Sequence, residues 1–194
     1  MQSEHFAEVV ALQASCFPPP FPAELLWQNH HLARHLEIFP EGQFVALADG
    51  QVIASASSLR VTQKMWDDHG CWDDLTGGLE LRNHAPDGSI LYGADISVHP
   101  AWRGQGIGKA LYQARYDLVR RQQLEAYATA CRIPDFQGSG LDVMSYVAAI
   151  LSGRLVDRTL SPLVRMGLQV VGIQENVMDD PESGNAAVRL EWRP

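Results

Sequence analysis

The stretch HPAWRGQGIGKAL, residues His99 to Leu111, places three glycines behind an arginine and then opens into a helical pattern. It follows the apolar run SILYGADISV, residues 89–98, which is typical of a strand and stops before Pro100. Apolar residues then recur on one face of a helix expected over residues 107–119: Ile107, Leu111, Ala114 and Leu118. The stretch therefore predicts a strand, a tight turn and a helix in direct succession.

The glycine turn is suited to an anion. The start of a helix presents unpaired N–H groups and the positive end of the helix dipole, and glycine lets the main chain approach a ligand closely. Two familiar phosphate loops are excluded. Gly104 lies too close to Gly108-Lys109 for the ATP-type loop, and Ala110 has no hydroxyl for magnesium. The dinucleotide pattern GxGxxG fails because the third glycine comes one residue early.

The run Arg103-Gly104-Gln105-Gly106-Ile107-Gly108, after Val98-His99-Pro100, closely resembles the (Q/R)xxGx(G/A) motif of the GNAT acyl-CoA N-acyltransferase superfamily. The resemblance implies that acetyl-CoA is the co-substrate. Its pantetheine arm would pair with the main chain of Ile96, Ser97 and Val98 as an added strand. Its pyrophosphate would bind the backbone amides of Arg103, Gly104, Gln105, Gly106, Ile107, Gly108 and Lys109. The side chains of Arg103 and Lys109 either add charge there or are solvated.

The remaining pattern predicts an α+β fold. Helices are expected over residues 3–16, 23–38, 141–151 and about 157–166, and strands over 43–47, 51–61, 124–131, 168–174 and 187–192. Leu79, Leu81 and His84 are candidates for a further short strand. The resemblance implies a mixed, mostly antiparallel central sheet flanked by helices, with a splayed parallel strand pair at the CoA site. We expect one domain over residues 1–194, with excursions at 62–88 and 135–160.

Amide formation from a thioester needs a neutral amine, donors for the developing oxyanion and no covalent enzyme intermediate. Asp95 is the candidate for binding or deprotonating the amine, because similar acetyltransferases often have a carboxylate on this strand. Strand alternation places it on the face opposite Ile96 and Val98, unless a bulge intervenes. The alternative is a carboxylate that pairs with an arginine or caps a turn. Cys131, in an apolar strand, is expected in the core.

The sequence departs from the family in three places. Leu163 stands where similar enzymes have a tyrosine that acts as the general acid, so the proton donor is unassigned. Tyr146, His84 or a water are the candidates, and Tyr146 and His84 are placed in the substrate pocket. The usual first strand is absent or very short. The long segments 62–88 and 135–160 are expected to cover the acceptor pocket.

Two segments, one rich in histidine and one containing two tryptophans, have structural interpretations as well as functional ones. His30, His31 and His35 lack the HExxH pattern of a zinc site, so a polar helix face is favoured over a metal site. In Trp66-Asp-Asp-His-Gly-Cys-Trp72-Asp-Asp, the acidic groups are suited to an amine. A solvated loop anchored by two tryptophans is the favoured interpretation.

The composition limits the partners. The formal net charge is −8 with dispersed arginines, so nucleic acid is not expected. No run approaches the roughly 18 apolar residues of a membrane span, and no secretion signal opens the chain, so we expect a soluble, cytoplasmic protein without a metal. The predicted function is transfer of acetyl to a small-molecule or peptide amine, with a homodimer plausible by base rate. A non-catalytic acyl-CoA-binding module is the alternative, and a nucleotide phosphohydrolase is disfavoured by the loop spacing.

Overall fold

The computed structural model describes residues 1–19 and 21–194, in which six strands form one sheet in the order β1-β2-β3-β4-β6-β5. The strands are β1 (Gln43–Ala48), β2 (Gln51–Val61), β3 (Ile90–Val98), β4 (Ala126–Cys131), β5 (Gln169–Gln174) and β6 (Ala187–Trp192). β3 and β4 are parallel because a helix connects them, and the other neighbouring strands are antiparallel. The mixed, mostly antiparallel sheet with one parallel pair is confirmed.

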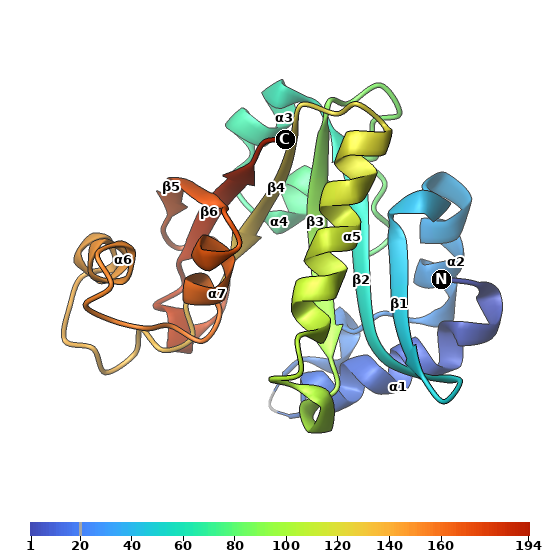
Figure 1. The fold of residues 1–194 in the computed structure, drawn as a ribbon, viewed down its shortest axis with the longest axis horizontal. Coiled ribbons are helices and arrows are strands. Elements are labelled where there is room, and N and C mark those ends of the chain that lie inside the picture. Colours follow the sequence, from blue (N-terminus) through green and yellow to red (C-terminus); the bar gives the residue numbers. More distant parts are fainter. Residues whose placement is uncertain (20) are drawn as a thin grey trace.

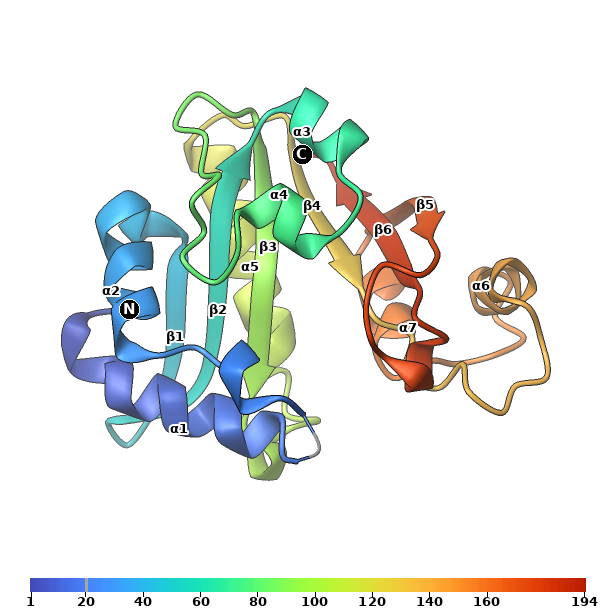
Figure 2. The ribbon, with the colours of Figure 1, turned by 180° about the vertical axis from the view of Figure 1, so that it is seen from behind.

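Helices cover both faces of the sheet (Figures 1 and 2). One face carries α1 (Phe6–Cys16), α2 (Asn29–Ile38), α3 (Gln63–Asp68) and α4 (Trp72–Thr76). The other carries α5 (Ile107–Arg121) and α7 (Leu160–Arg165), with α6 (Val143–Leu151) beyond α7 at the end of the molecule. Short 3-10 turns occur at Ser3–His5, Ala23–Leu25, Pro40–Gly42, Pro100–Trp102 and Pro181–Ser183. None of the helices in the described residues is long and apolar enough to cross a membrane.

The core has one part on each face of the sheet. On the α5 side, Leu91, Val119 and Leu190 are fully buried, and Leu163 and Cys131 join them. On the α1 side, the fully buried residues include Leu32, Leu59, Trp66, Ile90 and Ala128. Burying an aliphatic or aromatic side chain stabilises the fold by roughly 1.5–3 kcal/mol. The two parts together therefore hold the strands of the sheet in place.

The expected elements at the start of the chain differ in detail from the observed ones. Residues 1–5 contain no strand, so the chain enters α1 directly after a 3-10 turn. The helix expected over 23–38 begins only at Asn29. Gln28, just before it, has extended backbone, and its N–H donates to Nδ1 of His31 at 3.0 Å, which fixes the helix start.

The possible strand at Leu79, Leu81 and His84 was wrong. Residues 79–84 form turns after the short helices α3 and α4, and Leu81 has a positive φ of 53°. The apolar spacing at Leu79 and Leu81 that resembles a strand is explained by burial, because Leu81 is fully buried against the α1 side of the sheet. Segment 62–88 therefore covers one face of the sheet with helices and turns, and its tryptophans Trp66 and Trp72 pack on that face.

Candidate active site

The parallel pair separates after three residues. Ile90–Tyr92 of β3 pair with Ala126–Ala128 of β4, and the two strands diverge beyond that point. A cleft of about 450 Å³ opens where they part. Its lining residues come from β3 and α5 on one side and, on the other, from α7 and the residues that flank it: Ile96, Gly108, Lys109, Tyr112, Arg158, Thr159, Pro162, Leu163, Arg165 and Met166.

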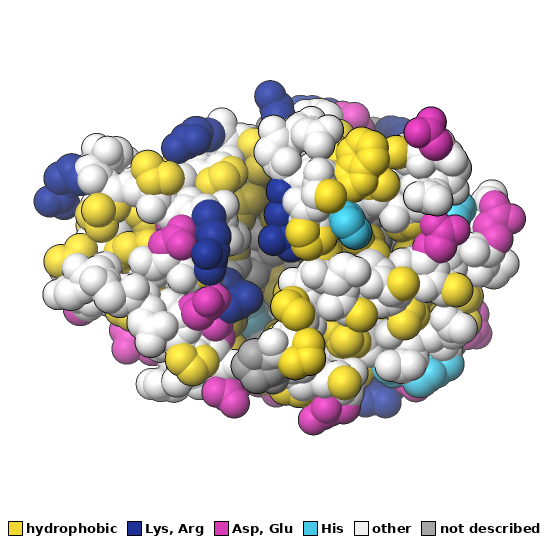
Figure 3. Space-filling model, turned by 90° about the horizontal axis from the view of Figure 1, so that it is seen from below, with side chains coloured by type: hydrophobic (Ala, Val, Ile, Leu, Met, Phe, Trp, Pro, Cys, Tyr) yellow, Lys and Arg dark blue, Asp and Glu magenta, His cyan; other side chains and the backbone are white. Residues whose placement is uncertain are grey.

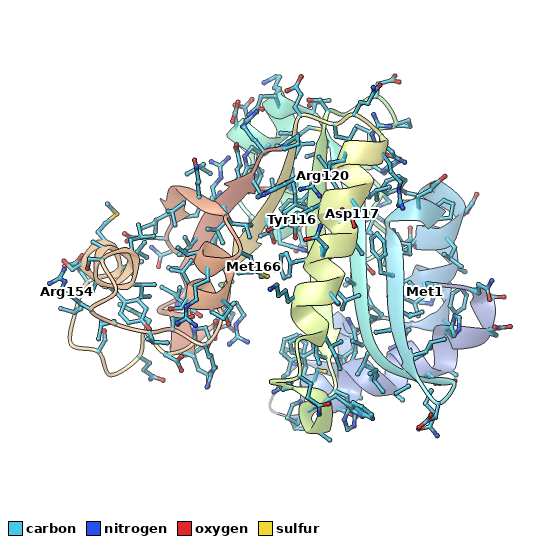
Figure 4. All side chains as sticks on the ribbon, viewed as in Figure 1. Met1, Tyr116, Asp117, Arg120, Arg154 and Met166 are labelled. Carbon is cyan, nitrogen blue, oxygen red and sulfur yellow. The ribbon has the colours of Figure 1, made fainter. Side chains whose placement is uncertain are left out.

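Basic side chains surround this cleft. Figure 3 shows a hollow between the two sides of the molecule with Lys and Arg side chains gathered around it, and Lys109, Arg158 and Arg165 are the basic residues in the lining. Met166 points from α7 toward α5, whereas Arg154 lies at the outer end of the molecule (Figure 4). Arg158 is engaged with Asp135 and Glu182. The cleft thus combines an apolar wall with positive charge at its rim.

The main chain of β3 faces the cleft at alternate residues. The N–H of His99 donates to the carbonyl of Ile53 in β2, and Ser97 lies opposite Ser55 in the same ladder. Antiparallel alternation therefore directs the main-chain groups of Ile96 and Val98 away from β2, toward the side where β4 has diverged. The Val98 carbonyl accepts from Arg103 Nε at 3.1 Å. Three residues were expected to pair with pantetheine. The main-chain N–H and C=O groups of Ile96 and Val98 are directed toward the cleft, whereas those of Ser97 are directed toward β2.

The glycine turn leaves open space above the start of α5. Gly104 and Gly106 have φ of 77° and 83°, a left-handed conformation that side chains rarely adopt. A Cβ at either position would meet no described protein atom within 4 Å. Gly106 is the N-cap of the 15-residue α5, whose first-turn amides need partners from outside the helix. This geometry suits an anion at the mouth of the cleft.

Asp95 lies across β3 from the cleft, on the α1 side of the sheet. Ser97 Oγ donates to its carboxylate at 3.4 Å, and Gln13 and Trp27 lie beside it. Burial raises the pKa of Asp95, and the positive charge of Arg115 acts in the opposite direction. The expected placement opposite Ile96 is observed, with a bulge just before Asp95. A carboxylate with a raised pKa in this position is suited to accept a proton.

His84 and Tyr146 are not brought to the cleft. His84 Nδ1 accepts from the N–H of Arg60, which pairs with Leu91, seven residues and roughly 20 Å along β3 from Val98. Tyr146 is buried on α6, and its hydroxyl donates to Asp157 at 3.1 Å. Asp157 in turn accepts the N–H of Leu160 at 2.7 Å, at the start of α7. Tyr146 therefore has a structural role in its own lobe.

Tyr112 lines the cleft and was missed by the sequence analysis. It lies four residues after Gly108 on α5, one helical turn along the same face, so helical spacing from the glycine turn would have found it. Burial raises the pKa of Tyr112 well above its usual value, which keeps the hydroxyl protonated. Leu163, at the position of the missing tyrosine, lies in the same lining. The cleft lining thus contains a tyrosine from α5, whereas α7 contributes Leu163.

The histidines of α2, His30, His31 and His35, do not form a metal site in the described part of the chain. His35 is buried and its Nε2 lies 2.7 Å from the carbonyl oxygen of Leu79. His31 accepts the N–H of Gln28. Within residues 1–19 and 21–194, no group of three or more His, Cys, Asp or Glu side chains is arranged to hold a metal ion. The contacts of His31 and His35 are those of helix capping and packing.

A family model described as the acetyltransferase (GNAT) family matches residues 6–139. The chain belongs to this family. It is 38% identical over 187 residues to the "Uncharacterized N-acetyltransferase YkwB" of Bacillus subtilis (strain 168), covering 95% of this chain and 83% of that protein. It is 35% identical over 195 residues to the "Probable hydrolase YhcX" of the same organism, covering 99% of this chain and 37% of that protein.

Solved structures of low sequence identity share the GNAT fold. The "GphF GNAT-like decarboxylase in complex with isobutyryl-CoA" superposes with a TM-score of 0.78 at 21% identity, covering 100% of this chain and 96% of that one. The loading GNATL domain of CurA from Lyngbya majuscula gives a TM-score of 0.77 at 18% identity, covering 100% and 94%. These likenesses extend the GNAT fold beyond residue 139, to the whole of this GNAT-family chain.

Proposed function

We propose that this protein transfers an acetyl group from acetyl-CoA to a primary amine, by direct attack within a ternary complex. The observation that carries the proposal is the cleft at the β3–β4 divergence, which continues from the glycine turn to the main chain of Ile96. The pyrophosphate binds the first-turn amides of α5, with Lys109 nearby. The pantetheine arm lies along the main-chain groups of Ile96 and Val98 that are directed away from β2, as an added strand.

The amine reaches the thioester beside Asp95. Its nitrogen attacks the carbonyl, so that a C–N bond forms and the C–S bond breaks. The proton leaving the nitrogen passes to Asp95, directly or through a water, because burial raises the affinity of this carboxylate for a proton. The alternation that sets Asp95 across the strand from Ile96 supports approach of the amine from the α1 side.

The departing CoA thiolate accepts a hydrogen bond from the hydroxyl of Tyr112 and takes its proton from solvent. Tyr112 lies in the lining with Ile96, and its raised pKa keeps the hydroxyl in the protonated form that donates a hydrogen bond. Tyr112 thereby supplies the group that Leu163 lacks.

The experiment that tests the proposal is release of free CoA thiol from acetyl-CoA across a panel of small amines and peptides, with the acetylated product identified by mass. Turnover with at least one amine is expected. A non-catalytic acyl-CoA-binding module is the second candidate, favoured by the presence of Leu163 in the cleft in place of a hydroxyl. Tight binding of acetyl-CoA without turnover of any amine would favour that module and contradict transfer.

A further inference from the structure

Arg115 is a buried cation whose partners are neutral. It lies on α5 with 1% of its surface exposed. Its guanidinium carbon lies 5.5 Å from the centre of the Tyr112 ring and 5.6 Å from the centre of the Tyr127 ring. Its Nε donates to Ser58 Oγ at 3.1 Å and its Nη1 to the Tyr127 hydroxyl at 3.1 Å. No described carboxylate oxygen forms an ion pair with it. Since burying an unpaired charge is costly, these neutral contacts point to a specific task.

The remaining donor of Arg115 is directed at a break in the sheet. Its Nη2 donates to the carbonyl of Ser57 at 2.8 Å and to the carbonyl of Asp95. These two residues face each other where the register between β2 and β3 shifts, with Ala94 as the extra residue of a bulge. Arg115 thus satisfies carbonyls on both strands at the irregularity.

Three successive carbonyls of the bulge bind side chains. Gly93 accepts from Thr129 Oγ1 of β4 at 3.1 Å, and Ala94 accepts from Trp72 Nε1 of α4 at 3.0 Å. Asp95 accepts from Arg115 of α5. Trp72 acts from one face of the sheet and Arg115 from the other. The bulge is therefore held by donors from three separate elements.

The bulge decides which amides face the cleft. Before it, Leu91 packs on the α5 side while Ile90 and Tyr92 pack on the α1 side. After it, Ile96 and Val98 pack on the α5 side. Since the alternation of a strand has a period of two, removal of the extra residue would send the main-chain groups of Ile96 toward β2. The amide that faces the cleft thus depends on the bulge.

We propose that Arg115 is a positioning residue: by holding the carbonyls of Ser57 and Asp95 it fixes the bulge and so aims the Ile96 N–H at the thioester carbonyl. The proposal rests on the function proposed above and adds a residue to its machinery. Arg115 acts through Ile96 without contact to the substrate. Loss of Arg115 therefore impairs recognition of the acyl carbonyl while the pyrophosphate site stays intact.

The test compares two ligands by calorimetry: acetyl-CoA and S-ethyl-CoA, a thioether of similar size without the carbonyl. The wild type is expected to bind acetyl-CoA about fivefold more tightly, the effect of one hydrogen bond. Arg115→Met should bring this ratio close to one and leave the affinity for S-ethyl-CoA within about threefold. Arg115→Lys, which retains part of the donor set, should give an intermediate ratio.

Two further variants separate positioning from general stability. Leu118→Ala removes a buried apolar side chain from the same helix without touching the bulge, so it should lower stability and keep the wild-type ratio. Trp72→Phe removes the donor to Ala94 from the opposite face and should reduce the ratio even if Arg115→Met does not fold. With a reactive amine, Arg115→Met should lower kcat about 100-fold, whereas KM for acetyl-CoA should rise by no more than the roughly fivefold loss of affinity.

If Arg115→Met keeps the wild-type ratio of acetyl-CoA to S-ethyl-CoA affinity, the positioning role is overturned and the proposed function stands. If Arg115→Met does not fold, the same conclusion follows when Trp72→Phe and Arg115→Lys both keep the wild-type ratio. A reduced ratio in Leu118→Ala overturns the positioning role as well, since any loss of packing would then suffice. Absence of binding of both ligands to the folded wild type overturns the proposed function together with this inference.

Discussion

Gly106→Ala separates the ligand-binding role of the glycine turn from its structural role. Gly106 has φ of 83°, and no described atom lies within 4 Å of the position that a Cβ would take, so the protein itself leaves room for the methyl group. The left-handed conformation should cost about 1–2 kcal/mol of folding stability. For a chain of this size that lowers Tm by roughly 2–8 °C. Gly50, in the β1–β2 turn outside the cleft lining, has φ of 81° and equally open space, so Gly50→Ala is a matched control.

The two variants should differ only when acetyl-CoA is present. At a concentration of 100 times Kd, the ligand stabilises the wild type by about 2.7 kcal/mol. The methyl group at Gly106 displaces the pyrophosphate from the α5 amides, and loss of one hydrogen bond to a charged group weakens binding about ten- to hundredfold. The same ligand concentration then stabilises Gly106→Ala by about 0.4–1.4 kcal/mol, and Gly50→Ala by the full wild-type amount. Equal ligand-induced shifts in the two variants, measured by thermal unfolding, would refute the assignment of the turn.

The remaining predictions concern protons. Tyr112→Phe should lower kcat at least 100-fold with unchanged acetyl-CoA affinity, as measured by thiol release. Tyr116→Phe, on the same helix but stacked on Trp192 outside the cleft lining, should stay near wild type, and equal activity of the two variants would count against the donor role. Asp95 must be ionised to accept a proton, so activity should fall as the pH drops through its raised pKa, and Asp95→Asn should remove this limb of the rate profile. The pKa of His35 is lowered by burial from 6.5 to about 4, so the unfolded state binds more protons in that interval. The contribution of His35 should therefore lower the free energy of unfolding by about 2 kcal/mol as the pH falls from 7 to 5. In urea unfolding His35→Gln should lose less, and an equal loss would contradict the assignment.

The part of the fold nearest the glycine turn could be predicted because its residues restrict the backbone. Pro100 ends the strand, and glycines with positive φ allow the turn into α5. The hairpin around Asp49-Gly50 was equally predictable, since both residues adopt positive φ between β1 and β2. These assignments depend on local geometry alone.

Features that depend on distant contacts could not be predicted. The alternation at Leu79 and Leu81 has the appearance of a strand, yet it arises because Leu81 packs under turns that follow α4. The sequence analysis assigned His84 to the substrate pocket, whereas in the structure His84 contacts Phe39 and Arg60. The course of a long loop depends on such contacts, and they cannot be read from the loop's own sequence. Arg115 lies four residues after the apolar Leu111, and a charge at such a helix position was the available signal.

The central claim is that the cleft between α5 and α7 binds acetyl-CoA, and calorimetric titration of the wild type with acetyl-CoA tests it most directly. Micromolar binding is expected, and it should be lost in Gly106→Asp, which sets a negative charge against the pyrophosphate. Absence of binding to the folded wild type would contradict the account and leave the glycine turn with a purely structural role.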